Sequence, residues 1–339
     1  MKQLKKTYFA KHGPYIFSQQ KRHKMKTVFF QYILLAFKGF CMGASDVVPG
    51  VSGGTMAFIL GIYEDLLRAI KSFDIHALRH LLHLRLSSFC KHVQWKFLLS
   101  ILSGIICAIF SLAKILNWLL INRPVFIWSF FFGLIIGSVF TVVRQIDKWN
   151  LPVFISMISG TAAAYTIVGI MPVSTPNTPW SLFLSGAIAI CAMILPGISG
   201  SFILVILGKY QYVLAAVNHR DFITLFFVAS GACCGIVLFV RFLNLMFNRY
   251  HDIIVATLTG FMIGSLKKVW PWKQTCEGIK HLPRDILENI QVNVLPSSFD
   301  TEVKSALFLM MLGLLAVLTV SFLAERKKTK HIESGCTGL

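Results

Sequence analysis

The chain has 339 residues, of which 55% are hydrophobic and 14% are charged. Soluble domains carry about 25% charged residues, so this composition excludes an ordinary soluble enzyme and a disordered protein. Lysine and arginine total 33 against 14 acidic residues, a formal net charge of +19. Because the basic residues lie between long apolar runs, we expect this charge to meet anionic lipid head groups and not nucleic acid.

Residues 1–26 form a polar, basic arm, and no small-residue cleavage pattern follows the first apolar run. This pattern predicts that no signal peptide is removed. The 8 cysteines include no Cys-x-x-Cys pair, and most lie inside apolar runs. They are typical of packing residues, so we expect neither a metal site nor another cofactor.

Six apolar segments are long enough to cross a bilayer, which needs about 20 residues. They are Phe97–Ile121, Val125–Val143, Leu151–Met171, Phe222–Phe247, about Asp252–Val269, and Val303–Ala324. The predicted fold class is therefore an all-α integral membrane protein with about six transmembrane helices.

Two further apolar regions, residues 27–70 and 181–217, are each interrupted by the sequence Pro-Gly-x-Ser-Gly. Proline ends a helix and glycine permits a sharp reversal, so we expect four residues to break these helices. They are Pro49, Gly50, Pro196 and Gly197. Because the arms of the second region are short for a crossing, we predict two re-entrant hairpins of two half-helices each.

The interruption belongs to an internal repeat. A shift of 147 residues places residues 38–74 on 185–221, and a shift of 127 residues relates the parts that follow. An odd number of crossings separates the two hairpins, which predicts inverted repeats at residues 27–171 and 172–324. Inverted repeats with discontinuous helices are a recurring transporter architecture.

Loop charges predict the orientation. Residues 1–26 hold eight Lys/Arg and residues 71–96 hold five, and the tail at 325–339 is also basic. The positive-inside rule therefore places both termini in the cytoplasm and the loop 270–302 outside the cell. The segment Ile75–Leu86 reads as a basic amphipathic surface helix, with a zinc site and a pH sensor as alternatives for its histidines.

The repeated motif is the strongest candidate for chemistry. The half-helices that begin near Gly53 and Gly200 point free N–H groups at the hairpin tips, where serine hydroxyls can cap or donate. Such a tip favours an anion, phosphate above all, although a plain kink with a serine cap is the alternative. The candidate phosphate-binding residues are Ser52, Gly53, Gly54, Thr55, Ser199, Gly200 and Ser201.

Fixed cations are needed as well, because helix termini alone cannot offset the burial of an anion. Lys114 and Arg241 occupy equivalent repeat positions near opposite membrane faces, where each could receive a head group or snorkel to lipid. Lys38, Arg68 and Lys209 are secondary cations within or beside apolar segments.

Acidic and aromatic residues near the motifs allow further interpretations. Asp46 could bind a coupling proton or cation, or pair with a lysine or cap the hairpin. Glu64 lies four residues before Arg68, which favours a structural ion pair between them. Tyr63 and Tyr210 are paired by the repeat and are typical of interfacial anchors.

The segments Gly43–Thr55 and Ile194–Tyr210 resemble the polyprenyl-phosphate transporter family, formerly domain of unknown function 368, over residues 30–325. The resemblance implies translocation of undecaprenyl phosphate from the outer to the inner leaflet of the bacterial cytoplasmic membrane for reuse. Its phosphate would bind between the two hairpin tips, and its tail would stay in lipid. A homo-oligomer is compatible with this activity.

Two alternatives stay open. Membrane undecaprenyl-pyrophosphate phosphatases resemble this chain, but their Pro-Gly-x-Ser motif continues with arginine where this sequence has Gly53 and Gly200. The missing phosphate clamp argues against phosphoryl chemistry and against an enzyme. A transporter or channel for a small anion is the second alternative, because helix termini also suit such ions.

Overall fold

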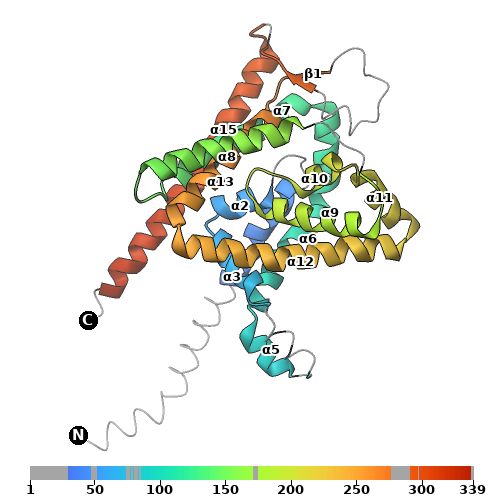
Figure 1. Ribbon diagram of the computed structural model, residues 1–339. Coiled ribbons are helices and arrows are strands. Elements are labelled where there is room, and N and C mark those ends of the chain that lie inside the picture. The colour runs from blue at the N-terminus through green and yellow to red at the C-terminus, as the bar shows by residue number, and fades with distance from the viewer. Residues whose placement is uncertain are drawn as a thin grey trace, which may run out of the picture.

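The computed structural model describes residues 30–46, 52–73, 77, 79, 83, 85–170, 175–275, 291–296 and 298–336 (Figure 1). Residues 30–46 form a helix. It is followed by α2 (Gly53–Ile59), α3 (Tyr63–Lys71), α5 (Leu86–His92), α6 (Trp95–Asn122), α7 (Pro124–Val143) and α8 (Leu151–Gly169). The second half contains α9 (Pro179–Ile194), α10 (Gly200–Ile206), α11 (Tyr210–His219), α12 (Phe222–Arg249), α13 (His251–Val269), β1 (Lys273–Thr275), β2 (Gln291–Asn293) and α15 (Thr301–Cys336).

Five of the described helices are long and apolar enough to cross a membrane, or six if the pair α10–α11, bent by 106°, counts as one span. The five segments are Trp95–Leu112, Pro124–Val143, Leu151–Gly169, Phe222–Arg249 and Thr301–Phe322. The predicted multi-pass, all-α membrane protein is thereby confirmed. The sixth predicted crossing does form a helix, α13, but Asp252, Lys267 and Lys268 near its ends make it more polar than the others.

Each interrupted region consists of three helical pieces, where the sequence predicted two. The second break follows α2 at Gly61 and α10 at Gly208, and both glycines have φ +64°. This left-handed conformation ends a helix and is open to glycine at little cost. The half-helices begin at Gly53 and Gly200 as predicted.

Glycines bring the helices of each half into close contact at equivalent positions. A Cβ on Gly104 of α6 would collide with the backbone of Ala36 in the helix of residues 30–46. A Cβ on Gly231 of α12 would collide in the same way with Phe183 of α9. The repeat predicted from sequence therefore recurs in the packing, since Gly231 follows Gly104 by 127 residues and Phe183 follows Ala36 by 147. The inverted orientation of the halves stays a prediction.

The later helices of the two halves interlock. A Cβ on Gly133 of α7 would collide with the carbonyl oxygen of Met310 in α15, and one on Gly260 of α13 would collide with that of Met157 in α8. Thus α7 packs on α15 and α8 on α13, so each pair joins one half to the other. Figure 1 shows α8 beside α13 and α9 beside α12, with α2 between these groups.

Two parts of the second half differ from the prediction. The expected loop 270–302 contains two short antiparallel strands, β1 and β2, in which Lys273 pairs with Asn293. The expected tail at 325–339 continues α15 as far as Cys336, because its Glu, Arg and Lys residues are good helix formers. The basic arm 1–26, the residues Pro49 and Gly50, and most of Ile75–Leu86 lie outside the described residues.

Candidate functional site

The first break brings a carboxylate onto the start of a half-helix. The amide of Gly53 donates to Oδ1 of Asp46 at 2.7 Å, and the amide of Gly54 donates to Oγ of Ser52 at 3.1 Å. Two of the N–H groups that a helix start leaves unpaired are thereby satisfied. The position expected to attract an anion is therefore occupied by the chain's own anion, Asp46.

The two glycines at the start of α2 are required by what packs against them. A Cβ on Gly53 would lie 2.5 Å from Oδ2 of Asp46, and one on Gly54 would lie 2.6 Å from the carbonyl oxygen of Ile194. Real Cβ atoms do not approach other atoms so closely. The first glycine therefore admits the Asp46 carboxylate, and the second admits the backbone of the other motif.

The two motifs are in direct contact. Ser52 Oγ donates to the carbonyl oxygen of Met193 at 3.0 Å, with that of Leu195 at 3.4 Å as a second acceptor. In return, the amide of Gly197 donates to Oγ1 of Thr55 at 2.9 Å. Ser52 and Thr55 are 1% and 2% exposed, so both hydroxyls are committed to joining the halves.

The second motif has no acidic residue at the position equivalent to Asp46. Met193 stands at the equivalent position, and its Cβ would lie 3.2 Å from a Cβ built on Gly200. Ser199 occupies the N-cap position of α10, but within the described residues its side chain forms no cap hydrogen bond. Its Oγ lies 2.8 Å from Oγ of the exposed Ser201. The hydroxyls of the second motif are therefore less constrained than those of the first.

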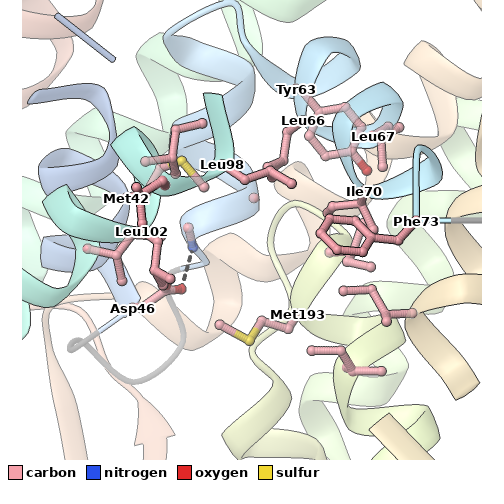
Figure 2. Close-up of a pocket in the computed structure, with 18 of the residues that line it drawn as sticks. Met42, Asp46, Tyr63, Leu66, Leu67, Ile70, Phe73, Leu98, Leu102 and Met193 are labelled. Atoms are coloured by element: carbon pink, nitrogen blue, oxygen red, sulfur yellow. Dashed lines mark hydrogen bonds between the residues drawn. The ribbon is translucent and has the colours of Figure 1, made fainter. Parts of the chain in front are cut away.

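An apolar cavity of about 500 Å³ opens beside the first motif (Figure 2). Asp46, Gly53 and Gly54 line it, and Asp46 and Tyr63 are the ionisable residues among its described walls. The remaining wall is almost entirely apolar and comes from α3, the first half of α6 and α9, with Met42 of the helix 30–46 and Ile236 of α12. Its members include Leu66, Leu67, Ile70, Phe73, Leu98, Leu102, Ile105 and Met193. Such walls suit hydrocarbon next to a single polar group.

The predicted cations are distributed elsewhere. Lys114 on α6 and Arg241 on α12 are exposed, and neither lines the apolar cavity. The α6 residues in its wall end at Ile105, so Lys114 lies about 13 Å further along that helix.

Lys209 is 0% exposed, and its Nζ donates to the carbonyls of Thr175 and Pro176 and to Oδ1 of Asn177 at 2.6–2.8 Å. Its three protons are thus used in holding the segment before α9.

Lys38, Glu64 and Arg68 line a second, polar cavity of about 530 Å³. The expected ion pair between Glu64 and Arg68 is wrong. Arg68 instead contacts Asp65 at 2.6 Å, because a residue three positions away is as close on a helix as one four away. Glu64 turns toward His251 at the start of α13, with 3.7 Å between Oε1 and Nε2.

The two tyrosines of the repeat have different surroundings. Tyr63 is 3% exposed, so the interpretation of this residue as an interfacial anchor is wrong. Its ring packs on Phe58, with 4.1 Å between centroids, and on Phe247 at 6.0 Å. Tyr210 is half-buried at the start of α11. Packing against Phe247 of α12, which local sequence does not reveal, helps to explain the burial of Tyr63.

Sequence reasoning did not identify Arg144 as a site residue, although it lines the polar cavity with Lys38 and Arg68. In the sequence it was noted only as one of the basic charges in a short loop after α7. Its position in the turn that follows a buried helix was the available signal.

Among the described residues, no group of three His, Cys, Asp or Glu is placed to hold a metal ion.

The family model described as VCA0040-like, undecaprenyl phosphate translocase-like, matches residues 42–283. The chain belongs to this family. Both motifs and the apolar cavity lie within the matched residues, and the resemblance seen in the sequence is confirmed. No solved structure matches the chain.

Two relatives carry the name polyprenyl-phosphate transporter. The protein of Vibrio cholerae serotype O1 is 40% identical over 301 residues, which cover 87% of this chain and 98% of that protein. The protein of Staphylococcus aureus is 30% identical over 254 residues, 69% of this chain and 84% of that protein. The chain of this family member therefore spans nearly the full length of its Vibrio relative.

Proposed function

We propose that the chain moves undecaprenyl phosphate from the outer to the inner leaflet of the bacterial cytoplasmic membrane, where the carrier lipid is reused. The observation that carries this proposal is the contact between the two motifs, at Ser52–Met193 and Thr55–Gly197, beside an apolar cavity. Amides and hydroxyls next to an apolar chamber match a ligand with a phosphate head and a hydrocarbon tail. The names of the two relatives point to the same ligand class.

The first motif would bind the head group through the amides of Gly53 and Gly54 and, once their contacts with the second motif open, through the hydroxyls of Ser52 and Thr55. The second motif would bind it through Ser199, Gly200 and Ser201. The cavity of about 500 Å³ would receive only the first units of the tail, and the rest would stay in the bilayer. Alternating access of inverted halves would expose the site to each leaflet, with Lys114 and Arg241 receiving the head group near opposite faces.

Asp46 gives this site a means of coupling. Its carboxylate holds the Gly53 amide at 2.7 Å, so a phosphate that takes this amide must displace it. Two anions cannot share one donor without repulsion, whereas a protonated Asp46 can leave the amide to the phosphate. Binding of the lipid would therefore favour uptake of a proton by Asp46.

The proposal is tested by reconstituting the full chain in liposomes and following a fluorescent polyprenyl phosphate from one leaflet to the other. Ser52→Ala, Ser199→Ala and Arg241→Gln should reduce the rate at least severalfold, while Ser230→Ala and Arg249→Gln on α12 serve as controls. Asp46→Asn should remove the response of the rate to a pH gradient. Normal rates in all three site variants would contradict the assignment of the site.

The same vesicles separate the alternatives. Release of inorganic phosphate from undecaprenyl pyrophosphate would identify an enzyme and overturn the proposal. Flux of small inorganic anions without movement of the lipid would identify an anion carrier. We expect movement of the lipid without either of these signals.

A further inference from the structure

The polar cavity shares one wall residue, Tyr63, with the apolar cavity. Its wall comes from the turn between α2 and α3, the C-terminal end of α7, and Ser321 of α15. Tyr63 lines both cavities, and Figure 2 shows it above Ile70 among the residues that line the apolar cavity. A ligand that occupied both cavities would therefore pass this one side chain.

The charges around the polar cavity favour an anion. Three cations line it, Lys38, Arg68 and Arg144, against the two acids Glu64 and Asp65. Asp65 is engaged by Arg68 at 2.6 Å, and Glu64 faces His251 at 3.7 Å. Within the described part of the chain, Arg144 forms no ion pair. Its guanidinium can therefore receive two oxygens of a phosphate.

Lys38 is held in place by a bond to the backbone. Its Nζ donates to the carbonyl oxygen of Leu60 at 2.8 Å, where the turn at Gly61 ends α2. This bond holds the half-buried ammonium at the end of the helix. The cation is thus fixed at the rim of the polar cavity.

Tyr63 adds an observation that itself points to a ligand. The residue is 3% exposed, and its hydroxyl has no hydrogen-bond partner among the described residues. Phe58 and Phe247 hold the ring, so a phenylalanine would fill the same space. A buried hydroxyl without a partner costs free energy, and a role in binding explains why the chain carries it.

We propose that this polar cavity is a second binding site for the phosphomonoester head group of the lipid, with Arg144 on the phosphate oxygens, the Tyr63 hydroxyl donating to one of them, and Lys38 adding positive charge to the wall. The inference rests on the proposed function and adds a head-group site at the end of the molecule where α7 meets the loop 144–149. Loop charges place this end in the cytoplasm. The site would receive the head group after it leaves the motifs, before release into the inner leaflet.

The test uses oriented proteoliposomes of the full chain, with fluorescent polyprenyl phosphate supplied to either leaflet in turn. Arg144→Gln should raise the half-saturating lipid concentration about tenfold when the lipid is supplied to the leaflet next to the polar cavity. The increase should be less than twofold when the lipid is supplied to the other leaflet. Glu64→Gln removes a negative charge that would repel the phosphate. This variant should lower the half-saturating lipid concentration for lipid supplied to the same leaflet. Lys148→Gln, a charge removed four residues from Arg144 and outside the cavity, is the matched control.

Tyr63→Phe separates a binding role from a structural one. Thermal stability should stay equal or rise because an unpaired buried hydroxyl is removed, while transport falls severalfold. The second site would be overturned if Tyr63→Phe transported lipid normally and if Arg144→Gln had the same half-saturating lipid concentration as Lys148→Gln. Normal transport by the wild type would still uphold the proposed function in that case. Absence of transport by the wild-type chain would overturn both.

A thermal-shift measurement identifies the source of the phosphate. Polyprenyl phosphate in nanodiscs should stabilise the wild-type chain, and Arg144→Gln should reduce that shift. Inorganic phosphate at millimolar concentration should give little of it. An equal shift from inorganic phosphate alone would assign the cavity to a free anion and overturn the lipid site.

Discussion

Ser52 donates a hydrogen bond to the carbonyl oxygen of Met193, 141 positions later in the chain, at 3.0 Å. The Oγ of Ser52 also caps α2 by accepting from the amide of Gly54 at 3.1 Å. One hydroxyl therefore starts a half-helix and fastens it to the other half of the protein. Its counterpart Ser199 does neither within the described residues, so the repeat divides these tasks unequally.

Ser52→Ala should destabilise the protein far more than Ser199→Ala. The first change removes a cap and a buried donor, worth together about 1–3 kcal/mol, whereas the second removes one contact with Ser201. The difference in stability is measured by heating each variant in detergent and recording how much protein stays monodisperse. Equal losses of stability would show that the asymmetry of the two caps has no energetic consequence.

The reciprocal bond, from the Gly197 amide to Thr55 Oγ1, gives a second prediction. Thr55→Val keeps the shape of a side chain that is 2% exposed but leaves the amide unpaired, at a cost of about 1–3 kcal/mol. Thr55→Ser keeps the acceptor and should retain most of the stability. If valine were tolerated as well as serine, the bond would not help to hold the motifs together.

Local sequence was sufficient to predict the crossings and the starts of the half-helices, because chain length, hydropathy and glycine act over a few residues. It gave capping of the hairpin by Asp46 only as one of several alternatives, since the carboxylate reaches the Gly53 amide from seven positions earlier in the chain. The burial of Tyr63 against Phe247 depends on packing between α3 and α12, far apart in the chain. Those contacts decide the site, and only the fold supplies them.

Gly133→Ala and Gly260→Ala should each separate a pair of interlocked helices. A methyl group at either position would enter the backbone of α15 or α8, which cannot move aside as a flexible side chain can. We expect losses of about 1–3 kcal/mol or more, read as aggregation during size-exclusion chromatography. Gly169→Ala is the control, because its Cβ would meet only the flexible Nζ of Lys267 at 3.0 Å.

The buried lysine gives a prediction about the segment before α9. Lys209→Met keeps the apolar stem but leaves the carbonyls of Thr175 and Pro176 without their donor. Leaving buried acceptors without their donor costs about 1–3 kcal/mol, so the variant should be less stable than the wild type. Proteolysis should become faster near residue 175. Wild-type resistance to protease in Lys209→Met would contradict a role in anchoring this segment.

Asp221 predicts a dependence of stability on pH. It caps α12 by accepting from the hydroxyl of Thr224 at 2.7 Å and from the amides of Ile223 and Thr224 at 3.2 Å. The bonds from Thr224 first, and then that from Ile223, lower the pKa of this carboxyl below its ordinary value of 3.8. Because the folded pKa is the lower one, the stabilisation is complete above pH 3.8 and is lost as the pH falls through the folded value.

The thermal midpoint of the wild type should therefore decline below about pH 4, and part of this decline should be absent in Asp221→Asn, since asparagine still caps but does not titrate. Asp147→Asn, in the exposed loop after α7, provides a carboxylate control with no role at a helix start. A decline of the same size in Asp221→Asn and in the wild type would assign the acid sensitivity to other carboxylates and remove Asp221 from the explanation.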